Sequence, residues 1–276
     1  MQIVIIGASI SGMMAAARWP DAVLLELGRP EDLAPVMVAT FYAHQRVPVF
    51  AEEEIEVQTQ VVGHGGAREY AFKVYGDPEA LVSQSSIRSL SRAWLWDGKA
   101  LAATIQGRTH FTTPATYIDL NRKLVQTSHR TFLYDSLIVT APLPLLLALT
   151  GIPMPVQPFR SEPIWLEMWP AEEMGYPILP AGRMVVRYFP DMDIPWYRSN
   201  QRGNEVELEY TDRMVPERVR KTGRVLRPGK IWAHPAAASF VALLEQFDVH
   251  CLGRYARWEQ KWLSHQTWEQ IQQMAL

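Results

Sequence analysis

The 276-residue sequence has little that would tie it to a membrane, an oxidising compartment or a polyanion. It holds a single cysteine, Cys251, which excludes an internal disulfide and suits a reducing cytoplasm. No run of about 18 apolar residues is present, so no membrane span is expected. The apolar segment 3–6 is too short for a signal peptide. The formal net charge of −2 gives the chain as a whole no strong attraction for nucleic acid. We therefore expect a cytoplasmic protein.

The composition is that of a globular chain with a sizeable core. Hydrophobic residues make up 48% and charged residues 20% of the sequence, and the length fits one large domain or two interleaved ones. Ten tryptophans are many for this length. Most of them should lie in the core, although a cluster at the surface would offer a stacking platform.

The sharpest pattern in the chain lies in residues 1–26. An apolar run ends at Gly7-Ala8-Ser9-Ile10-Ser11-Gly12, a helix-like stretch of small residues follows, and a second apolar run stops at Glu26. This order predicts a βαβ unit that holds a dinucleotide. The glycine turn and the helix start would bind the pyrophosphate, and the Glu26 carboxylate would accept hydrogen bonds from a ribose. An ordinary βαβ unit without a ligand is the alternative.

The middle position of this Gly-x-Ser-x-x-Gly pattern is Ser9, where a glycine is usual. Its hydroxyl could donate to a phosphate oxygen, so we treat Ser9 as a tolerated departure. The segment Trp19-Pro20-Asp21 should end the helix quickly.

Further along the chain, alternating apolar residues predict a strand over 55–62, a turn over 63–66 and a returning strand over 70–75, which together form a hairpin. Asp77-Pro78-Glu79 predicts a helix start for 78–85. Other expected elements are a buried strand that ends at Thr140, a strand at Glu205–Tyr210, and a C-terminal strand followed by a helix over about 263–274.

A basic run lies between residues 213 and 230. It has two readings: a solvated face or the rim of an anion-binding site. Its members are Arg213, Arg218, Arg220, Lys221, Arg224, Arg227 and Lys230. Glu217 is the only acidic residue in this part of the sequence.

Three separate segments together resemble one group of flavoproteins. They are the N-terminal glycine unit, the strand end Tyr134-Asp-Ser-Leu-Ile-Val-Thr140-Ala-Pro-Leu-Pro144, and the tail Leu252-Gly-Arg-Tyr-Ala-Arg-Trp258. The group contains the FAD-dependent amine oxidases, protoporphyrinogen oxidases and UDP-galactopyranose mutases. The segment Glu69–Asp77 looks like small phage and bacterial members of it.

The resemblance implies an α/β fold with two interleaved parts. A Rossmann-like FAD-binding domain of the glutathione-reductase type is expected over 1–54, 100–158 and 225–276. A smaller α+β substrate domain is expected over 55–99 and 159–224. No metal site is expected.

The resemblance also implies which residues would contact FAD. The first motif and its acid would hold the pyrophosphate and ribose, and the other two motifs would pass along the cofactor towards the flavin. The residues are Gly7, Ala8, Ser9, Ile10, Ser11, Gly12, Glu26, Leu27, Arg29, Thr140, Ala141, Pro142, Gly253, Arg254, Trp262, Ser264 and His265.

The activity that the resemblance implies is FAD-dependent oxidation of the C–N bond of an amine, with hydrolysis of the imine and net cleavage. A suitable substrate is an amino-acid-type adduct on a modified pyrimidine of phage DNA, met in the host cytoplasm. His44, Trp165 and Tyr188 are candidates to line the catalytic site. Arg218, Arg220 and Arg224 are candidates to contact a nucleotide or DNA.

Two other functions stay open on the sequence. A mutase-like flavoprotein would act on a nucleotide-sugar, and the same arginines would hold its diphosphate. A non-catalytic FAD-binding protein would share the cofactor site but lack a reaction.

Overall fold

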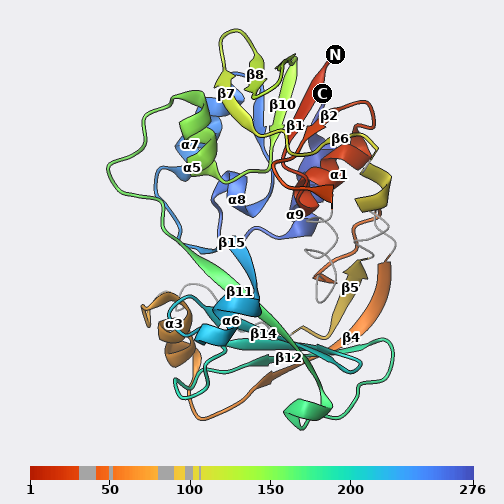
Figure 1. The fold of residues 1–276 in the computed structure, drawn as a ribbon, viewed down its shortest axis with the longest axis vertical. Coiled ribbons are helices and arrows are strands. Elements are labelled where there is room, and N and C mark those ends of the chain that lie inside the picture. Colours follow the sequence, from red (N-terminus) through yellow and green to blue (C-terminus); the bar gives the residue numbers. More distant parts are fainter. Residues whose placement is uncertain (31–41, 50–51, 80–89, 97–101, 106) are drawn as a thin grey trace.

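The computed structural model of the protein describes residues 1–30, 42–49, 52–79, 90–96, 102–105 and 107–276. It divides into two lobes, each built on its own large β-sheet (Figure 1). The upper lobe in Figure 1 contains both ends of the chain, and the long strands β11 and β15 reach from the lower lobe towards it. The chain therefore crosses between the lobes several times, as interleaved domains require.

The upper lobe is organised around a five-stranded parallel sheet in the order β16-β10-β1-β2-β6. Its strands are short, and they come from the beginning, middle and end of the sequence. They are β1 (Ile3–Ile6), β2 (Val23–Leu25), β6 (Thr109–His110), β10 (Ser136–Val139) and β16 (Val249–Cys251).

Both faces of this sheet are covered, which is why β1 and β10 are buried at every position. One face packs on α1 (Ile10–Arg18) and α9 (Ser264–Gln273). The other face packs on helices that follow β10, β15 and β16 and on a small three-stranded sheet. These elements are α5 (Leu143–Thr150), α7 (Ala237–Glu245), α8 (Gly253–Arg257), β7 (Ala115–Asp119), β8 (Leu124–Thr127) and β9 (Thr131–Leu133).

The lower lobe is an eight-stranded sheet in the order β15-β11-β14-β13-β12-β4-β5-β3. All of its neighbours are antiparallel except β12 and β4, which run parallel. The strands are β3 (Tyr42–Ala43), β4 (Glu52–Val61), β5 (Arg92–Trp96), β11 (Ser161–Pro170), β12 (Arg183–Tyr188), β13 (Arg198–Arg202), β14 (Glu205–Thr211) and β15 (Arg224–Ile231).

The predicted hairpin over 55–75 is wrong in its second half. β4 is present, but residues 67–75 form the helix α3 (Ala67–Tyr75). The helix is capped at both ends: the Glu69 carboxylate accepts a hydrogen bond from Gly66 N at 2.8 Å, and Gly76 ends it with φ of 71°. Its buried face has helical spacing, from Tyr70 to Val74.

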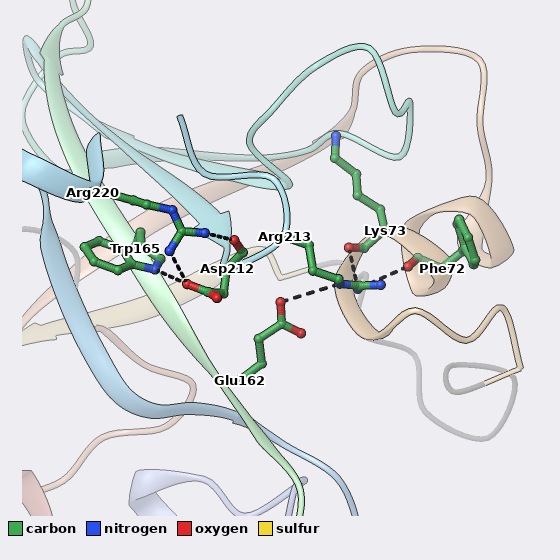
Figure 2. Close-up of polar contacts among 7 residues, drawn as sticks. All are labelled: Phe72, Lys73, Glu162, Trp165, Asp212, Arg213 and Arg220. Carbon is green, nitrogen blue, oxygen red and sulfur yellow. Dashed lines mark hydrogen bonds and ion pairs between the residues drawn. The ribbon is translucent and has the colours of Figure 1, made fainter. Parts of the chain in front are cut away.

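Arg213 fastens the C-terminal end of α3 to the eight-stranded sheet (Figure 2). Its Nη2 donates to the Lys73 carbonyl at 3.2 Å, and its Nε lies 3.6 Å from the Glu162 carboxylate on β11. The cation therefore satisfies a free carbonyl of the last helical turn, where positive charge is favourable.

Several other predicted elements are confirmed. β14 covers the strand expected at Glu205–Tyr210, and β16 and α9 form the C-terminal strand and helix. α1 ends before the Trp19-Pro20-Asp21 segment. The helix expected over 78–85 lies mostly outside the described residues. Two other short helices are η1 (Glu172–Met174) and α6 (Glu217–Thr222), and residues 102–105 are also helical. Within these described ranges, no helix is both long and apolar enough to span a membrane.

Candidate functional site

A cavity of about 1140 Å³ lies between the two sheets. Its upper wall is the edge where the carboxyl ends of β1, β2, β10 and β16 meet, and its lower wall is one face of the eight-stranded sheet. Ligands of open parallel sheets bind at this carboxyl edge. The cavity is therefore the candidate functional site.

The glycine turn after β1 is packed tightly against the end of β10. Gly7 has a φ of +95°, and a Cβ on it would lie 2.5 Å from Thr140 Oγ1. The Thr140 hydroxyl lies 3.0 Å from the Gly7 carbonyl oxygen, and it accepts a hydrogen bond from Ser9 Oγ at 3.2 Å. The two sequence motifs thus form one structure, and in it the Ser9 hydroxyl is directed to Thr140.

Glu26 stands at the end of β2 and holds the loop around it. Its Oε2 accepts a hydrogen bond from Ala8 N at 2.5 Å, and its Oε1 accepts one from Gly28 N at 2.7 Å. A carboxylate has about four acceptor positions, so two remain for a ligand. The side chain lines the cavity.

The C-terminal motif closes the same edge of the sheet. Gly253 has a φ of +83°, and a Cβ on it would lie 2.3 Å from Ser11 Oγ in the first turn of α1. Arg254 Nε donates to the Trp262 carbonyl at 3.3 Å, which folds the segment before α9 back on α8. Leu263 N donates to Gln266 Oε1 at 2.8 Å and caps the start of α9.

The opposite wall of the cavity is formed largely by β15. Arg224 and Leu226 face the cavity from the regular part of this strand, where they pair with Leu166 and Ile164 of β11. The pairing then shifts, and Gly229 takes a φ of +73° at a point where a Cβ would lie 2.5 Å from the Glu162 carbonyl oxygen. This bulge allows consecutive residues to line the cavity, namely Arg227, Pro228, Gly229, Lys230 and Ile231.

A buried carboxylate, Glu209, lies at the bottom of the cavity. Its Oε1 accepts hydrogen bonds from Arg198 Nε at 2.7 Å and from Asn200 Nδ2 at 2.9 Å, and its Oε2 accepts one from the Tyr197 hydroxyl. Burial raises the pKa of Glu209, but Arg198, Lys230 and these donors outweigh it, so the pKa lies below its ordinary value. Glu209 is therefore ionised at neutral pH.

Lys230 is a cation of the cavity wall whose pKa is strongly lowered. Its Nζ lies 4.8 Å from the centre of the Tyr197 ring. Burial lowers its pKa, the positive charges of Arg198 and Arg254 lower it further, and Glu209 only partly opposes them, so that the pKa is about 7. A substantial fraction of Lys230 is therefore a neutral amine near pH 7.

This end of the cavity carries an excess of positive charge. Four cationic side chains, Arg198, Arg224, Arg227 and Lys230, line it together with two carboxylates, Glu207 and Glu209. Burial lowers the pKa of Arg224, and the charge of Glu207 opposes that shift. An anionic group on a ligand would complement the excess charge.

Most of the predicted FAD-contact residues meet at one cavity, although they come from three distant parts of the chain. Those that line it are Gly7, Ser9, Ile10, Ser11, Glu26, Leu27, Thr140, Ala141, Pro142, Gly253, Arg254, Trp262 and Ser264. Four others lie beside it rather than in its wall, namely Ala8, Gly12, Arg29 and His265.

Of the predicted catalytic residues, His44 and Tyr188 line the cavity and Trp165 does not. The His44 ring stacks on Tyr42 with 5.7 Å between ring centres. Tyr188 is buried, and its ring meets the edge of Tyr70. Their catalytic roles stay predictions.

The structure corrects the expected position of Trp165. Its neighbours on β11, Ile164 and Leu166, line the cavity, so alternation turns Trp165 to the opposite face of the sheet. There Trp165 Nε1 donates to Asp212 Oδ1 at 2.9 Å, and the same oxygen accepts a hydrogen bond from Arg220 at 2.8 Å (Figure 2).

The three predicted substrate arginines do not share one site. Arg224 lines the cavity, whereas Arg218 and Arg220 lie on α6 behind the sheet. Arg218 pairs with Glu167 and Arg220 with Asp212. The basic run is thus divided between a set of ion pairs at the surface and the cavity wall of β15. A contact of Arg218 or Arg220 with nucleic acid stays a prediction.

The sequence interpretation missed Arg198, Glu207 and Glu209. The signal was present in β14, where Glu205-Val-Glu-Leu-Glu alternates charged and apolar residues. The sequence predicted a strand here and assigned no role to its charged positions, whereas Glu207 and Glu209 are both buried and line the cavity.

No protein-family profile matches this chain, and no curated protein matches its sequence. Solved structures do match. A reduced UDP-galactopyranose mutase is 13% identical, with a TM-score of 0.69 over 98% of this chain and 93% of its own. A protein provisionally assigned as a protoporphyrinogen oxidase, from Exiguobacterium sp. 255-15, is 10% identical, with a TM-score of 0.53 over 98% of both chains. A fatty acid isomerase from P. acnes is 9% identical, with a TM-score of 0.50 over 99% and 98%.

The fold is Rossmann-like, with helices on both faces of a parallel sheet, and it matches these structures over nearly the whole chain. The predicted α/β fold class is therefore confirmed. At these identities the likeness concerns the fold, and it does not carry over the activity of any of these proteins.

Proposed function

We propose that the protein is an FAD-dependent enzyme that oxidises the C–N bond of an amine that also bears an anionic group. The observation that carries the proposal is one continuous cavity between the glycine turn at Gly7 and the cationic strand end at Lys230. Its volume of about 1140 Å³ exceeds the range of roughly 300–1,000 Å³ for drug-sized ligands. A cofactor and a substrate would share it.

The residues at the upper wall fit a dinucleotide. No side chain caps the N-terminus of α1, so the free N–H groups of its first turn remain available to a pyrophosphate. Glu26 keeps acceptor positions for a ribose, and Arg254 adds a positive charge at the same edge. When bound, the flavin would supply the two-electron acceptor of the reaction.

Lys230 supplies the proton chemistry that amine oxidation needs. A protonated amine holds its nitrogen lone pair in an N–H bond, so the substrate ammonium first has to lose a proton. With a pKa of about 7, the Lys230 amine accepts that proton at neutral and higher pH. Loss of a hydride from the adjacent carbon to the two-electron acceptor then gives an iminium ion. Water adds to the iminium carbon with loss of a proton, and cleavage of the C–N bond leaves a carbonyl compound and a shorter amine.

The substrate class follows from the charge and the rings of the lower wall. Arg224 and Arg227 would hold a carboxylate or phosphate, and Tyr42, His44 and Tyr188 offer aromatic surface to a base. An amino-acid-type adduct on a modified pyrimidine combines the amine to be oxidised, a carboxylate for the arginines and a base for the aromatic surface. We propose that the adduct is presented on a nucleotide or on phage DNA. In duplex DNA, the modified base would have to leave the stack to reach this cavity.

The first experiment is the visible spectrum of the purified protein, followed by anaerobic titration with amine-bearing nucleosides and DNA. We expect the spectrum of an oxidised flavin and its bleaching by a substrate that carries both an amine and a carboxylate. A matched nucleoside without the carboxylate should bleach the flavin much more slowly. A colourless protein that takes up no FAD would overturn the proposal and leave a different ligand for the cavity.

A mutase-like reaction on a nucleotide-sugar is the second candidate. It is favoured by the TM-score of 0.69 to a reduced UDP-galactopyranose mutase and by the arginines of β15. The two reactions differ in their need for electrons. A mutase requires reduced flavin and leaves it reduced, whereas amine oxidation consumes one oxidised flavin per turnover. A flavoprotein that neither bleaches with amines nor converts nucleotide-sugars would instead be a non-catalytic FAD-binding protein.

A further inference from the structure

Lys230 lies near the end of β15 and holds its amine in the wall of the cavity. The strand bulges at Gly229, and the Tyr255 hydroxyl donates to the Gly229 carbonyl at 3.0 Å, which fixes the bulge. The Lys230 Nζ lies 4.8 Å from the centre of the Tyr197 ring. Tyr197 is fully buried and donates its hydroxyl to the Glu209 carboxylate. The amine is therefore held over a fixed ring, in contact with the cavity.

This amine makes no hydrogen bond and no ion pair with the described residues. Lys73 shows the contrast, because it is 1% exposed and its Nζ donates to the carbonyls of Phe189 at 2.9 Å and Asp191 at 2.6 Å. Burial lowers the pKa of both lysines, to about 8 for Lys73 and about 7 for Lys230. What distinguishes Lys230 is that its amine faces a space in which a ligand can reach it.

Two arginines of the same strand, Arg224 and Arg227, line the same cavity. Neither forms a hydrogen bond or an ion pair with the described residues, whereas Arg218 and Arg220 behind the sheet are each paired with a carboxylate. A guanidinium that faces a cavity in this state can bind a carboxylate through two hydrogen bonds. A small ligand with a carboxylate would therefore be brought to the wall that holds the amine.

We propose that Lys230 forms a reversible imine with small oxo acids, in which a carbonyl carbon is bonded to a carboxylate. The nitrogen lone pair attacks the carbonyl carbon, and the two amine protons leave with the carbonyl oxygen as water, so no oxidant or reductant is consumed. The carboxylate would lie against Arg224 or Arg227. When the imine nitrogen takes up a proton it becomes a cation, and the ionised Glu209 would stabilise it.

The imine needs no flavin, so its formation does not depend on the proposed oxidation. The two reactions meet at the product. Oxidation of an amine carbon that bears a carboxylate would release an oxo acid, and Lys230 would hold that acid until water reverses the imine. This consequence, unlike the imine itself, rests on the proposed function. Oxo acids would then inhibit turnover, because an imine nitrogen cannot take the proton of the next substrate.

Reductive trapping tests the proposal. The purified protein is incubated at pH 7 with glyoxylate and cyanoborohydride, which converts an imine into a stable carboxymethyl group, and each lysine is followed by peptide mass spectrometry. We expect Lys230 to be labelled at least about tenfold faster than Lys221, a surface lysine paired with Glu217, because far more of its amine is neutral. Lys73 should stay almost unlabelled, since its amine is enclosed by its hydrogen bonds. Equal labelling of Lys221 and Lys230 would overturn the proposal.

Acetaldehyde is the matched probe for the carboxylate, since it is also a two-carbon aldehyde but carries no charge. The ratio of glyoxylate labelling to acetaldehyde labelling should be about tenfold higher at Lys230 than at Lys221. The ratio cancels differences in the reactivity of the two amines. The same ratio at both lysines would overturn the assignment of oxo acids as the ligand class.

The double variant Arg224→Gln, Arg227→Gln should lose most of this preference for glyoxylate while Lys230 still reacts with acetaldehyde. Arg183→Gln is the matched control, since Arg183 pairs with Glu56 at the surface, and it should keep the preference. Trapping at Lys230 in a protein that oxidises no amine would support this inference and count against the proposed function. Amine oxidation without trapping would overturn this inference alone.

Discussion

Gly12, in the first turn of α1, packs directly on the carbonyl group of Gly7. A Cβ at position 12 would lie 1.8 Å from the Gly7 oxygen, which is far inside van der Waals contact. The same carbonyl oxygen lies 3.0 Å from Thr140 Oγ1. The helix start, the glycine turn and the end of β10 are therefore held in one arrangement, which fixes the N–H groups that would face a pyrophosphate.

Gly7→Val and Gly12→Val should both abolish FAD binding. Gly7→Val would force a branched side chain into a φ of +95°, and Gly12→Val would push α1 away from the turn. Binding is measured by flavin fluorescence during titration of the apoprotein. Circular dichroism shows whether each variant still folds.

Ser9→Gly is the control in the same turn, and it should retain FAD. The change removes one hydrogen bond, from Ser9 Oγ to Thr140 Oγ1, and restores the more usual glycine. A variant with Gly at position 9 that fails to bind would show that the Ser9 hydroxyl itself contacts the cofactor.

Glu26→Ala should weaken FAD binding by about 1.5–3 kcal/mol if ribose hydroxyls donate to this carboxylate. Some of the loss would come from the loop, because Ala8 N and Gly28 N also lose their acceptor. Glu26→Gln separates the two effects, since its amide oxygen still accepts one hydrogen bond. Isothermal titration with FAD measures both variants, and an unchanged affinity in Glu26→Ala would exclude a ribose contact.

Lys230 should make stability depend on pH in the alkaline range. Its pKa is about 7 in the folded protein and about 10.4 in an unfolded chain. Between these values the unfolded state binds more protons, so the free energy of unfolding should rise with pH from about 7 to about 10. Lys230→Met removes this dependence, and the variant should exceed the wild type in stability most clearly below pH 7. Urea unfolding at pH 6 and pH 9 measures the difference, and equal differences at the two pH values would contradict it.

Glu209→Gln should destabilise the protein by about 3 kcal/mol, because it leaves the Arg198 guanidinium without its counter-charge. Glu217→Gln is the matched control: Glu217 pairs with Lys221 at the surface, and its loss should cost less than about 0.5 kcal/mol. Chemical unfolding of both variants gives the comparison. Similar losses in the two would show that the Glu209 pair contributes no more than a surface pair.

The predicted strand over 70–75, which is the helix α3 in the structure, shows a limit of prediction from average residue preferences. The segment Tyr70–Tyr75 contains enough aromatic and β-branched residues to suggest a strand. The capping pair of Gly66 and Glu69 and the stop at Gly76 were visible in the sequence and favoured a helix. Helical caps depend on single residues, and here they outweighed the average preference of the segment.

The sequence by itself determined those structural features that depend only on residues close together along the chain. The strand–turn–helix–strand order of residues 1–26 is local, because Gly7, Gly12 and Glu26 each act within one βαβ unit. The tertiary structure alone decided which distant charges meet. Strand alternation and the bulge at Gly229 set Arg224 and Lys230 on the side of Glu209. Alternation placed Trp165 on the other face of the sheet, where α6 packs and carries Arg218. Which face a residue takes, and which strand pairs beside it, is set by long-range packing that no local pattern contains.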